Sequence, residues 1–140
     1  MSKVYTYNPK QTKIAVGNHI VTGYDEDNFI TIEPAGDGTT MKVGCDGEVN
    51  RAISVNEAYN VKIALLQNSP SNAYLRTLHK RDKEEGTGIF PITVKDIMGE
   101  QIFTSESCWV SKEPSWQRGR ETSTVEWELQ CAWGEFRDGE

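Results

Sequence analysis

The side chains best suited to chemistry lie in an acidic run, YDEDNFITIEP, at residues 24–34. Asp25, Glu26 and Asp27 directly precede an apolar stretch, and Glu33 follows it. Carboxylates this close together could bind Ca²⁺ or act as the acid and base of a glycosidase. An EF-hand loop needs acids at alternate positions, a central glycine and a terminal glutamate, and this run does not meet that pattern. We therefore favour a surface role for these acids over a metal site or a catalytic pair.

Other groups for catalysis or metal binding are sparse. The imidazoles are His19 and His79, and the sequence contains neither a G-x-S-x-G turn nor a phosphate-binding loop. The cysteines, Cys45, Cys108 and Cys131, are far apart and form no C-x-x-C pair. This spacing favours buried, reduced thiols over a disulfide or zinc framework. We expect no enzyme activity, no cofactor and no bound metal.

Length and charge narrow the class of protein. The chain has 140 residues, enough for one domain with a real core, and carries a net charge of −6. An acidic chain is poorly suited to hold nucleic acid phosphates tightly, because such binding needs clustered lysine and arginine. No apolar run is long enough to span a bilayer, and the first ten residues lack the apolar core of a secretion signal. We therefore expect a protein that starts in the cytoplasm.

Alternation of apolar and polar residues predicts mostly β strands, and TSTVEWELQCAW at 122–133 is the clearest example. Glu126 and Glu128 are expected on the solvent-facing side of this strand. Its core face is expected to hold Val125, Trp127, Leu129, Cys131 and Trp133.

The remaining strands are predicted in four places. Residues 12–33 are expected to form a hairpin or two neighbouring strands, and residues 59–67 a single strand. TMKVGC and NRAISV flank a tight turn at Gly47, and residues 89–110 form two strands joined near Gly99. In the first of these places, one face is expected to carry Ile14, Val16 and Ile20.

One segment, NSPSNAYLRTLHKRDK, has helical spacing instead. Ser69 is a capping residue and Pro70 suits a first turn, which predicts a helix at about residues 70–82. The fold class is therefore mainly β, a β-sandwich or barrel-like domain with one short α-helix. We expect an N-terminal arm at 1–11, the domain at 12–135 and a C-terminal tail at 136–140.

An ordered series of stretches resembles the inner tail tube proteins of contractile-tailed bacteriophages and related bacteriocin particles. The stretches are GYDEDNFITIEP, GCDGEVNRAISVN, KIALLQNSPSNAYLRTL, FPITVKDIMGEQIFTSESCWVSKEP and ETSTVEWELQCA, and together they cover about residues 10–135. The resemblance implies homo-hexameric rings stacked into a tube inside a contractile sheath. Such a tube carries DNA without binding it specifically, or punctures a membrane in a bacteriocin, with no stable membrane association. It implies a place in the virion tail, assembly in the host cytoplasm, and the partners sheath, baseplate, tail terminator and tape-measure protein.

The resemblance also implies roles for the charged residues. Glu126 and Glu128 would face the lumen or a neighbouring subunit. Besides the N-terminal arm and the loop PAGDGTT, candidate ring-stacking residues are Asp25, Glu26, Asp27, Glu33 and Asp37. Candidate sheath-facing residues on the helix are Arg76, Lys80 and Arg81.

An alternative is a small carbohydrate- or ligand-binding β-sandwich module. Trp116 lies in the polar stretch KEPSWQRGRE, where an exposed ring could serve as a sugar platform. Chromatography and negative-stain microscopy at high concentration distinguish a monomeric module from a tube.

Overall fold

The computed structural model describes residues 4, 6–25, 28–97 and 99–138. These residues contain ten β strands and one α-helix, so the predicted mainly β fold with one short helix is confirmed. A large sheet has the strand order β2-β1-β7-β8-β9-β6-β3, with β10 also paired to β8, while β4 pairs with β5 separately. The elements are a 3-10 turn Pro9–Gln11, β1 Thr12–Val16, β2 His19–Ile20, β3 Ile30–Pro34, β4 Thr39–Val43, β5 Val49–Ile53, β6 Tyr59–Leu66, α1 Ser71–Glu85, β7 Phe90–Asp96, β8 Gln101–Lys112, β9 Thr124–Cys131 and β10 Glu135–Asp138.

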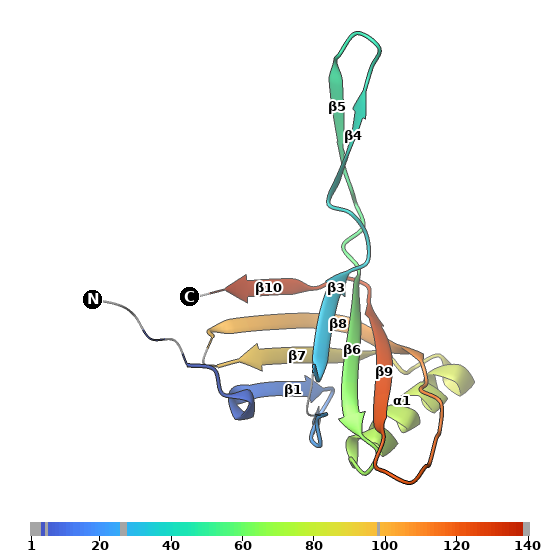
Figure 1. The fold of residues 1–140 in the computed structure, drawn as a ribbon. Helices are drawn as coiled ribbons and strands as arrows, with labels where there is room; N and C mark the ends of the chain where they lie inside the picture. The colour runs from blue at the N-terminus through green and yellow to red at the C-terminus, as the bar shows by residue number, and fades with distance from the viewer. Residues whose placement is uncertain (1–3, 5, 26–27, 98, 139–140) are drawn as a thin grey trace.

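The large sheet folds over so that its two halves cross. In Figure 1, β1, β7, β8 and β10 run across β3, β6 and β9. The long strand β8 belongs to both halves, because residues 101–104 pair with β10 and residues 108–112 pair with β9. The register shifts between Val110 and Lys112, a bulge of the kind that bends a strand.

The core fills the space between the two halves. Trp127, Leu129 and Cys131 on β9 are buried, as their alternation predicted, and Val125 is half-buried. Trp133 is 37% exposed, so its predicted core position is wrong. Strand β9 ends at Cys131, and the alternation therefore no longer applies two residues later.

The first predicted hairpin is only partly correct. β1 and β2 form a tight hairpin in which Ala15 lies opposite Ile20. Because paired residues share a side of the sheet, Ile20 points away from Ile14 and Val16 and is 55% exposed. The predicted shared face is wrong at this residue, and Val21 is buried instead.

Strand β3 does not lie beside β1 or β2 in the sheet. It pairs with β6, from Ile30 opposite Ile63 to Pro34 opposite Tyr59. β3 and β6 form the inner part of one long hairpin, and β4 and β5, which lie between them in the sequence, form its outer part. The chain therefore runs out along β4 and returns along β5, which places β6 beside β3. The expectation that residues 12–33 form neighbouring strands is therefore wrong for β3.

The outer part of this long hairpin, residues 39–53, stands clear of the rest of the molecule (Figure 1). We call it the projecting hairpin. Its turn is closed by the Gly44 N–H, which donates to the Glu48 carbonyl at 2.8 Å. Gly47 has a φ of 89°, which favours glycine, so the predicted turn is confirmed. The predicted stacking loop PAGDGTT forms the base of this hairpin and the start of β4.

Helix α1 packs against β8 and β2 and places Leu75 and Leu78 in the core. It ends three residues later than predicted, at Glu85 rather than about residue 82. The N-cap of α1 is Pro70, which makes no side-chain cap hydrogen bond, while the Ser69 hydroxyl one residue earlier accepts a hydrogen bond from the Ser71 N–H at 3.2 Å. None of the described helices is long and apolar enough to cross a bilayer.

Both ends of the described chain contain ordered structure. The Asn8 side chain accepts a hydrogen bond from the Lys10 N–H at 3.0 Å and caps the 3-10 turn. Residues 136–138, which we expected in a C-terminal tail, lie in β10 instead. Phe136 explains this placement, because its ring packs against Phe103 with centroids 4.8 Å apart and against Tyr59 at 5.8 Å.

Candidate assembly surfaces

One side of the β3-β6-β9 half carries mostly polar side chains, with Ala64 and Leu66 of β6 as apolar exceptions. Glu128 lies opposite Lys62, and Glu33 lies opposite Asn60. The alternate residues of these strands point into the core, so the polar ones share the outer side. We call this surface the polar face; it consists of Thr31, Glu33, Asn60, Lys62, Thr124, Glu126, Glu128 and Gln130.

Carboxylates outnumber cations on the polar face. Glu33, Glu126 and Glu128 share it with Lys62, and Lys112 at its rim lies 4.0 Å from Glu128. Asp25 is a fourth acid at the end of the polar face, because its Oδ1 accepts a hydrogen bond from the Thr124 hydroxyl at 2.8 Å.

The candidate stacking acids therefore lie in two places. Asp25 and Glu33, which we grouped as stacking residues, lie with Glu126 and Glu128, while Asp37 is exposed at the base of the projecting hairpin. Glu26 and Asp27 lie outside the described residues. Within the described ranges, no three His, Cys, Asp or Glu side chains gather as a metal site would require.

The projecting hairpin has one apolar side with nothing packed on it among the described residues. Strand pairing puts Met41 beside Arg51 and Val43 beside Val49, whereas Lys42 and Asn50 share the opposite side. Met41 is 69% exposed and Ile53 72%. We call the four apolar side chains on this side, Met41, Val43, Val49 and Ile53, the apolar hairpin face; Thr39 and Arg51 lie on the same side. Sequence reasoning found these strands but missed the uncovered face, although the alternation in TMKVGC contained the signal.

Two strand edges of the β3-β6-β9 half lack a partner within the described chain. β3 is at the end of the large sheet, and residues 109–112 of β8 pair only with β9. The Ala64 N–H donates to the Phe29 carbonyl, and the Ala35 N–H donates to Ala58. Hydrogen-bonded pairs alternate, so the N–H of Ile32 points away from β6 towards the open edge.

The basic helix residues differ in their surroundings. The Arg76 guanidinium lies 2.9 Å from the Glu113 carboxylate and 5.7 Å from the centre of the Trp127 ring. This arginine therefore helps fix the 113–123 loop to the helix. Lys80 and Arg81 are exposed on the next turn.

A serine–histidine pair is present but is built into the fold. His19 Nε2 and Ser71 Oγ are 2.8 Å apart, and the same hydroxyl accepts from the Thr22 N–H at 3.0 Å. Ser71 is fully buried, and the His19 ring stacks on Tyr74 with centroids 4.5 Å apart. The pair therefore ties the β1–β2 hairpin to the start of α1.

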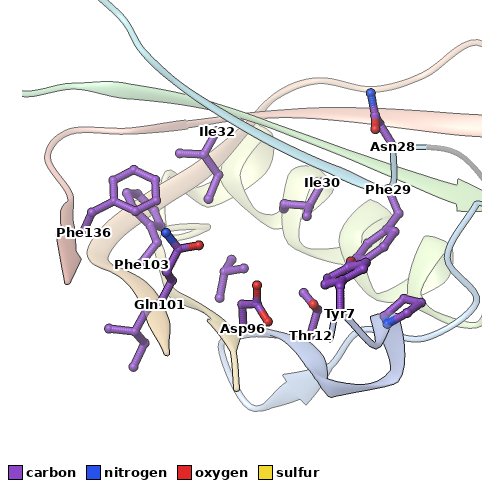
Figure 2. A pocket seen from close by; sticks show the side chains of 13 residues that line it. Tyr7, Thr12, Asn28, Phe29, Ile30, Ile32, Asp96, Gln101, Phe103 and Phe136 are labelled. Atoms are coloured by element: carbon purple, nitrogen blue, oxygen red, sulfur yellow. The ribbon is translucent and has the colours of Figure 1, made fainter. Parts of the chain in front are cut away.

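A cavity of about 400 Å³ opens between β3 and the β1–β7 side of the sheet. Figure 2 shows Ile30 and Ile32 pointing into it from β3, with Phe29 and Tyr7 at one end and Phe103 at the other. Its lining is mostly apolar. The Asp96 carboxylate also borders it and accepts a hydrogen bond from the Gly99 N–H at 3.2 Å.

The aromatic loop residue considered as a sugar platform is partly covered. Trp116 is 67% exposed, yet the Arg118 guanidinium lies over its ring, 4.3 Å from the centroid. One side of this ring is therefore occupied by the chain itself.

Known structures share this fold at low sequence identity. The cap of the anti-feeding prophage matches with a TM-score of 0.63 at 10% identity, covering 99% of this chain and 95% of that one. The sheath/tube terminator of the extracellular contractile injection system PVC matches at 0.63 and 13% identity, over 97% and 99%. The PVC sheath–tube complex gives 0.61 and 14%, over 96% and 93%.

Sequence comparison identifies the family. The structural protein ORF10 of Pseudomonas phage KPP10 is 28% identical over 142 residues, covering 96% of this chain and 82% of that protein. The model of the bacteriophage PhiTE tail tube protein family matches residues 10–136. The chain therefore belongs to the bacteriophage PhiTE tail tube protein family.

Proposed function

We propose that this chain forms hexameric rings that stack into the inner tail tube of a contractile-tailed phage or a related bacteriocin particle. Family membership supports a tube role in a phage tail. The main support for assembly into a tube is the projecting hairpin, because its apolar side is uncovered among the described residues. Exposed apolar surface of this kind marks an interaction site on a soluble protein.

Rings close through the two open edges. β3 of one subunit extends the sheet of its neighbour along residues 109–112 of β8, an edge unused among the described residues. The two edges differ, so the contact is head-to-tail, which generates a ring when the rotation closes. Pairing also removes edges that otherwise promote aggregation. Pro34 at the end of β3 fits an edge, since its missing N–H would point away from β6.

Rings stack through the projecting hairpin. The hairpin reaches the next ring, and a subunit of that ring covers the apolar hairpin face. A two-stranded hairpin is marginal by itself in water, so packing against another subunit would stabilise it. Asp37 at the hairpin base and the N-terminal arm lie at the same stacking contact.

The polar face lines the lumen. Glu33, Glu126 and Glu128, with Asp25 at its end, outnumber the nearby lysines. A negative wall repels phosphates, so DNA passes without being held. In a bacteriocin-type particle the same tube punctures a membrane.

The outer partners follow from this orientation. Lys80 and Arg81 on α1 face the contractile sheath, while Arg76 stays paired with Glu113. Baseplate and terminator proteins bind the two ends of the tube, and the tape-measure protein occupies the lumen. Assembly takes place in the host cytoplasm.

The apolar hairpin face provides the test of stacking. A variant carrying Met41→Ser, Val49→Ser and Ile53→Ser should remain folded but form no long tubes in electron micrographs. The matched control changes the other side of the hairpin, with Thr40→Ser, Lys42→Gln and Asn50→Ser, and should elongate normally. Long tubes from the first variant would contradict the proposal.

The lumen assignment has its own test. Assembled tubes carrying Glu126→Lys and Glu128→Lys should retain duplex DNA at low salt, in a salt-dependent manner, whereas wild-type tubes should not. The control, Glu84→Lys and Glu85→Lys on the exposed side of α1, makes the same change in net charge. Equal DNA retention by both variants would reject the lumen assignment.

A further inference from the structure

Two of the three cysteines face each other inside the protein. Cys108 on β8 lies directly opposite Cys131 on β9. Their exposed fractions are 0% and 1%, as expected for core thiols. Cys45 differs, because it lies exposed at the tip of the projecting hairpin, where the expectation of burial is wrong.

The backbone fixes the kind of pairing. The Ala132 N–H donates to the Ser107 carbonyl at 2.9 Å, which makes residues 107 and 132 a hydrogen-bonded pair. Such pairs alternate along an antiparallel ladder, so Cys108 and Cys131 form the next, non-hydrogen-bonded pair. Cα atoms in that position are about 4.5 Å apart and their side chains are closest. This lies inside the range that disulfides span, about 4.4–6.8 Å.

The two thiols also influence each other's ionisation. A hydrogen bond with Cys131 and burial raise the pKa of Cys108. A hydrogen bond from Cys108, with a smaller contribution from Ser105, lowers the pKa of Cys131 in spite of burial, which acts in the opposite direction. The thiolate is the reactive form, so Cys131 is the thiol of the pair that reacts first.

From this geometry we propose that Cys108 and Cys131 are a modification site, an oxidisable pair that a peroxide converts into a disulfide joining β8 to β9. The Cys131 thiolate attacks the peroxide O–O bond and forms a sulfenic acid, releasing hydroxide, which takes up a proton to become water. Cys108 then attacks that sulfur, its proton leaves, and the sulfenic oxygen departs as the second water. Overall, two thiols and one hydrogen peroxide give one disulfide and two waters.

The Cys108–Cys131 disulfide would join β8 to β9 where the sheet folds over. It closes the loop formed by residues 109–130, which includes the 113–123 segment between β8 and β9. Restricting the unfolded chain in this way should raise the midpoint of thermal unfolding by roughly 5–10 °C. A particle would thus gain a more rigid subunit when it leaves a reducing cytoplasm for an oxidising medium.

The experiment uses the folded full chain with Cys45→Ser, so that the exposed thiol does not contribute. Hydrogen peroxide should reduce the thiol count from two to zero and lower the mass by 2 Da. Dithiothreitol should reverse both changes and the rise in melting temperature. The controls, Cys45→Ser with Cys108→Ala or with Cys131→Ala, should show neither the loss of 2 Da nor the thermal shift.

A second experiment refolds the unfolded protein in a glutathione redox buffer. It distinguishes whether the two thiols are placed to form a disulfide from whether peroxide can reach them in the folded chain. Peptide mapping should find residues 108 and 131 cross-linked after either treatment. Free thiols after both treatments would overturn the proposed geometry. A bridge that appears only on refolding would overturn oxidation in the folded chain, as would sulfinic acid without a cross-link.

Discussion

The sheet body and the projecting hairpin are built from the same chain pattern with opposite burial. β5 and β6 follow one another. β6 alternates between apolar and polar residues from Tyr59 to Ile63, and β5 places Val49 and Ile53 on one side of the strand with Arg51 between them. On β6, Val61 and Ile63 are fully buried, whereas on β5, Val49 is 58% exposed and Ile53 72%. The difference lies in what covers the apolar side: the crossing half of the sheet does so in the body, and nothing does so in the described part of the hairpin. Alternation therefore identifies a face that needs a partner without saying whether the partner belongs to the same chain.

Stability should be distributed accordingly. Removing apolar atoms from a packed core leaves a cavity and loses contacts, whereas exposed apolar side chains lose little on truncation. Substitutions in the body should lower the free energy of unfolding, and substitutions in the hairpin should change assembly instead. The following predictions run from the largest expected effect on unfolding to the smallest.

Trp127→Ala should have the largest effect. Trp127 is fully buried and contacts Asn72 and Arg76 of α1, and truncation should cost about 3–5 kcal/mol of unfolding free energy. Urea denaturation followed by circular dichroism measures this. Trp116→Ala serves as the control, since its ring is mostly exposed and the loss should stay below about 1 kcal/mol. Equal losses would contradict the placement of the core.

Asn72→Ala should come next. Its Oδ1 accepts from Trp127 Nε1 at 2.9 Å, and its Nδ2 donates to the Leu66 carbonyl at 3.0 Å. The substitution leaves a buried indole N–H without its acceptor, which should cost about 1–3 kcal/mol. The same urea titration measures it. In the Trp127→Ala background the cost should shrink, and full additivity would show that the two residues do not act together.

Two glycines with positive φ test the body against the hairpin directly. A Cβ on Gly23, at φ 75°, would lie 2.6 Å from the Ser69 Cβ, so Gly23→Ala should lower global stability by about 1–3 kcal/mol. Gly47, at φ 89°, has no atom within 4 Å of such a Cβ. Gly47→Ala should therefore speed amide exchange within residues 39–53 and leave the global unfolding midpoint nearly unchanged. Similar global losses from both changes would mean that the hairpin unfolds together with the body.

The smallest effect on unfolding is expected for the apolar hairpin face. The triple variant Met41→Ser, Val49→Ser and Ile53→Ser should change the stability of the monomer by about 0.5 kcal/mol or less, because these side chains are exposed there. Differential scanning calorimetry of the unassembled chain measures this. A large loss would show that the face is already packed in the monomer.

Local pattern predicted the strands and the helix, because periodicity and capping are encoded within a few residues. The buried alternation of β9 is an example. Partners distant in sequence were harder to predict. The pairing of β3 with β6, and the resulting placement of Glu33 near Glu128, depends on how the projecting hairpin turns the chain back. The prediction that Trp133 lies in the core was wrong because the pattern gave no sign that β9 ends at Cys131.

The central claim is that a neighbouring subunit covers the apolar hairpin face in the tube. A cryo-electron microscopy structure of the assembled tube tests it most directly. We predict that Met41, Val49 and Ile53 contact side chains of an adjacent ring and are buried there. A tube in which these three side chains remain in solvent, with the rings joined elsewhere, would contradict the account.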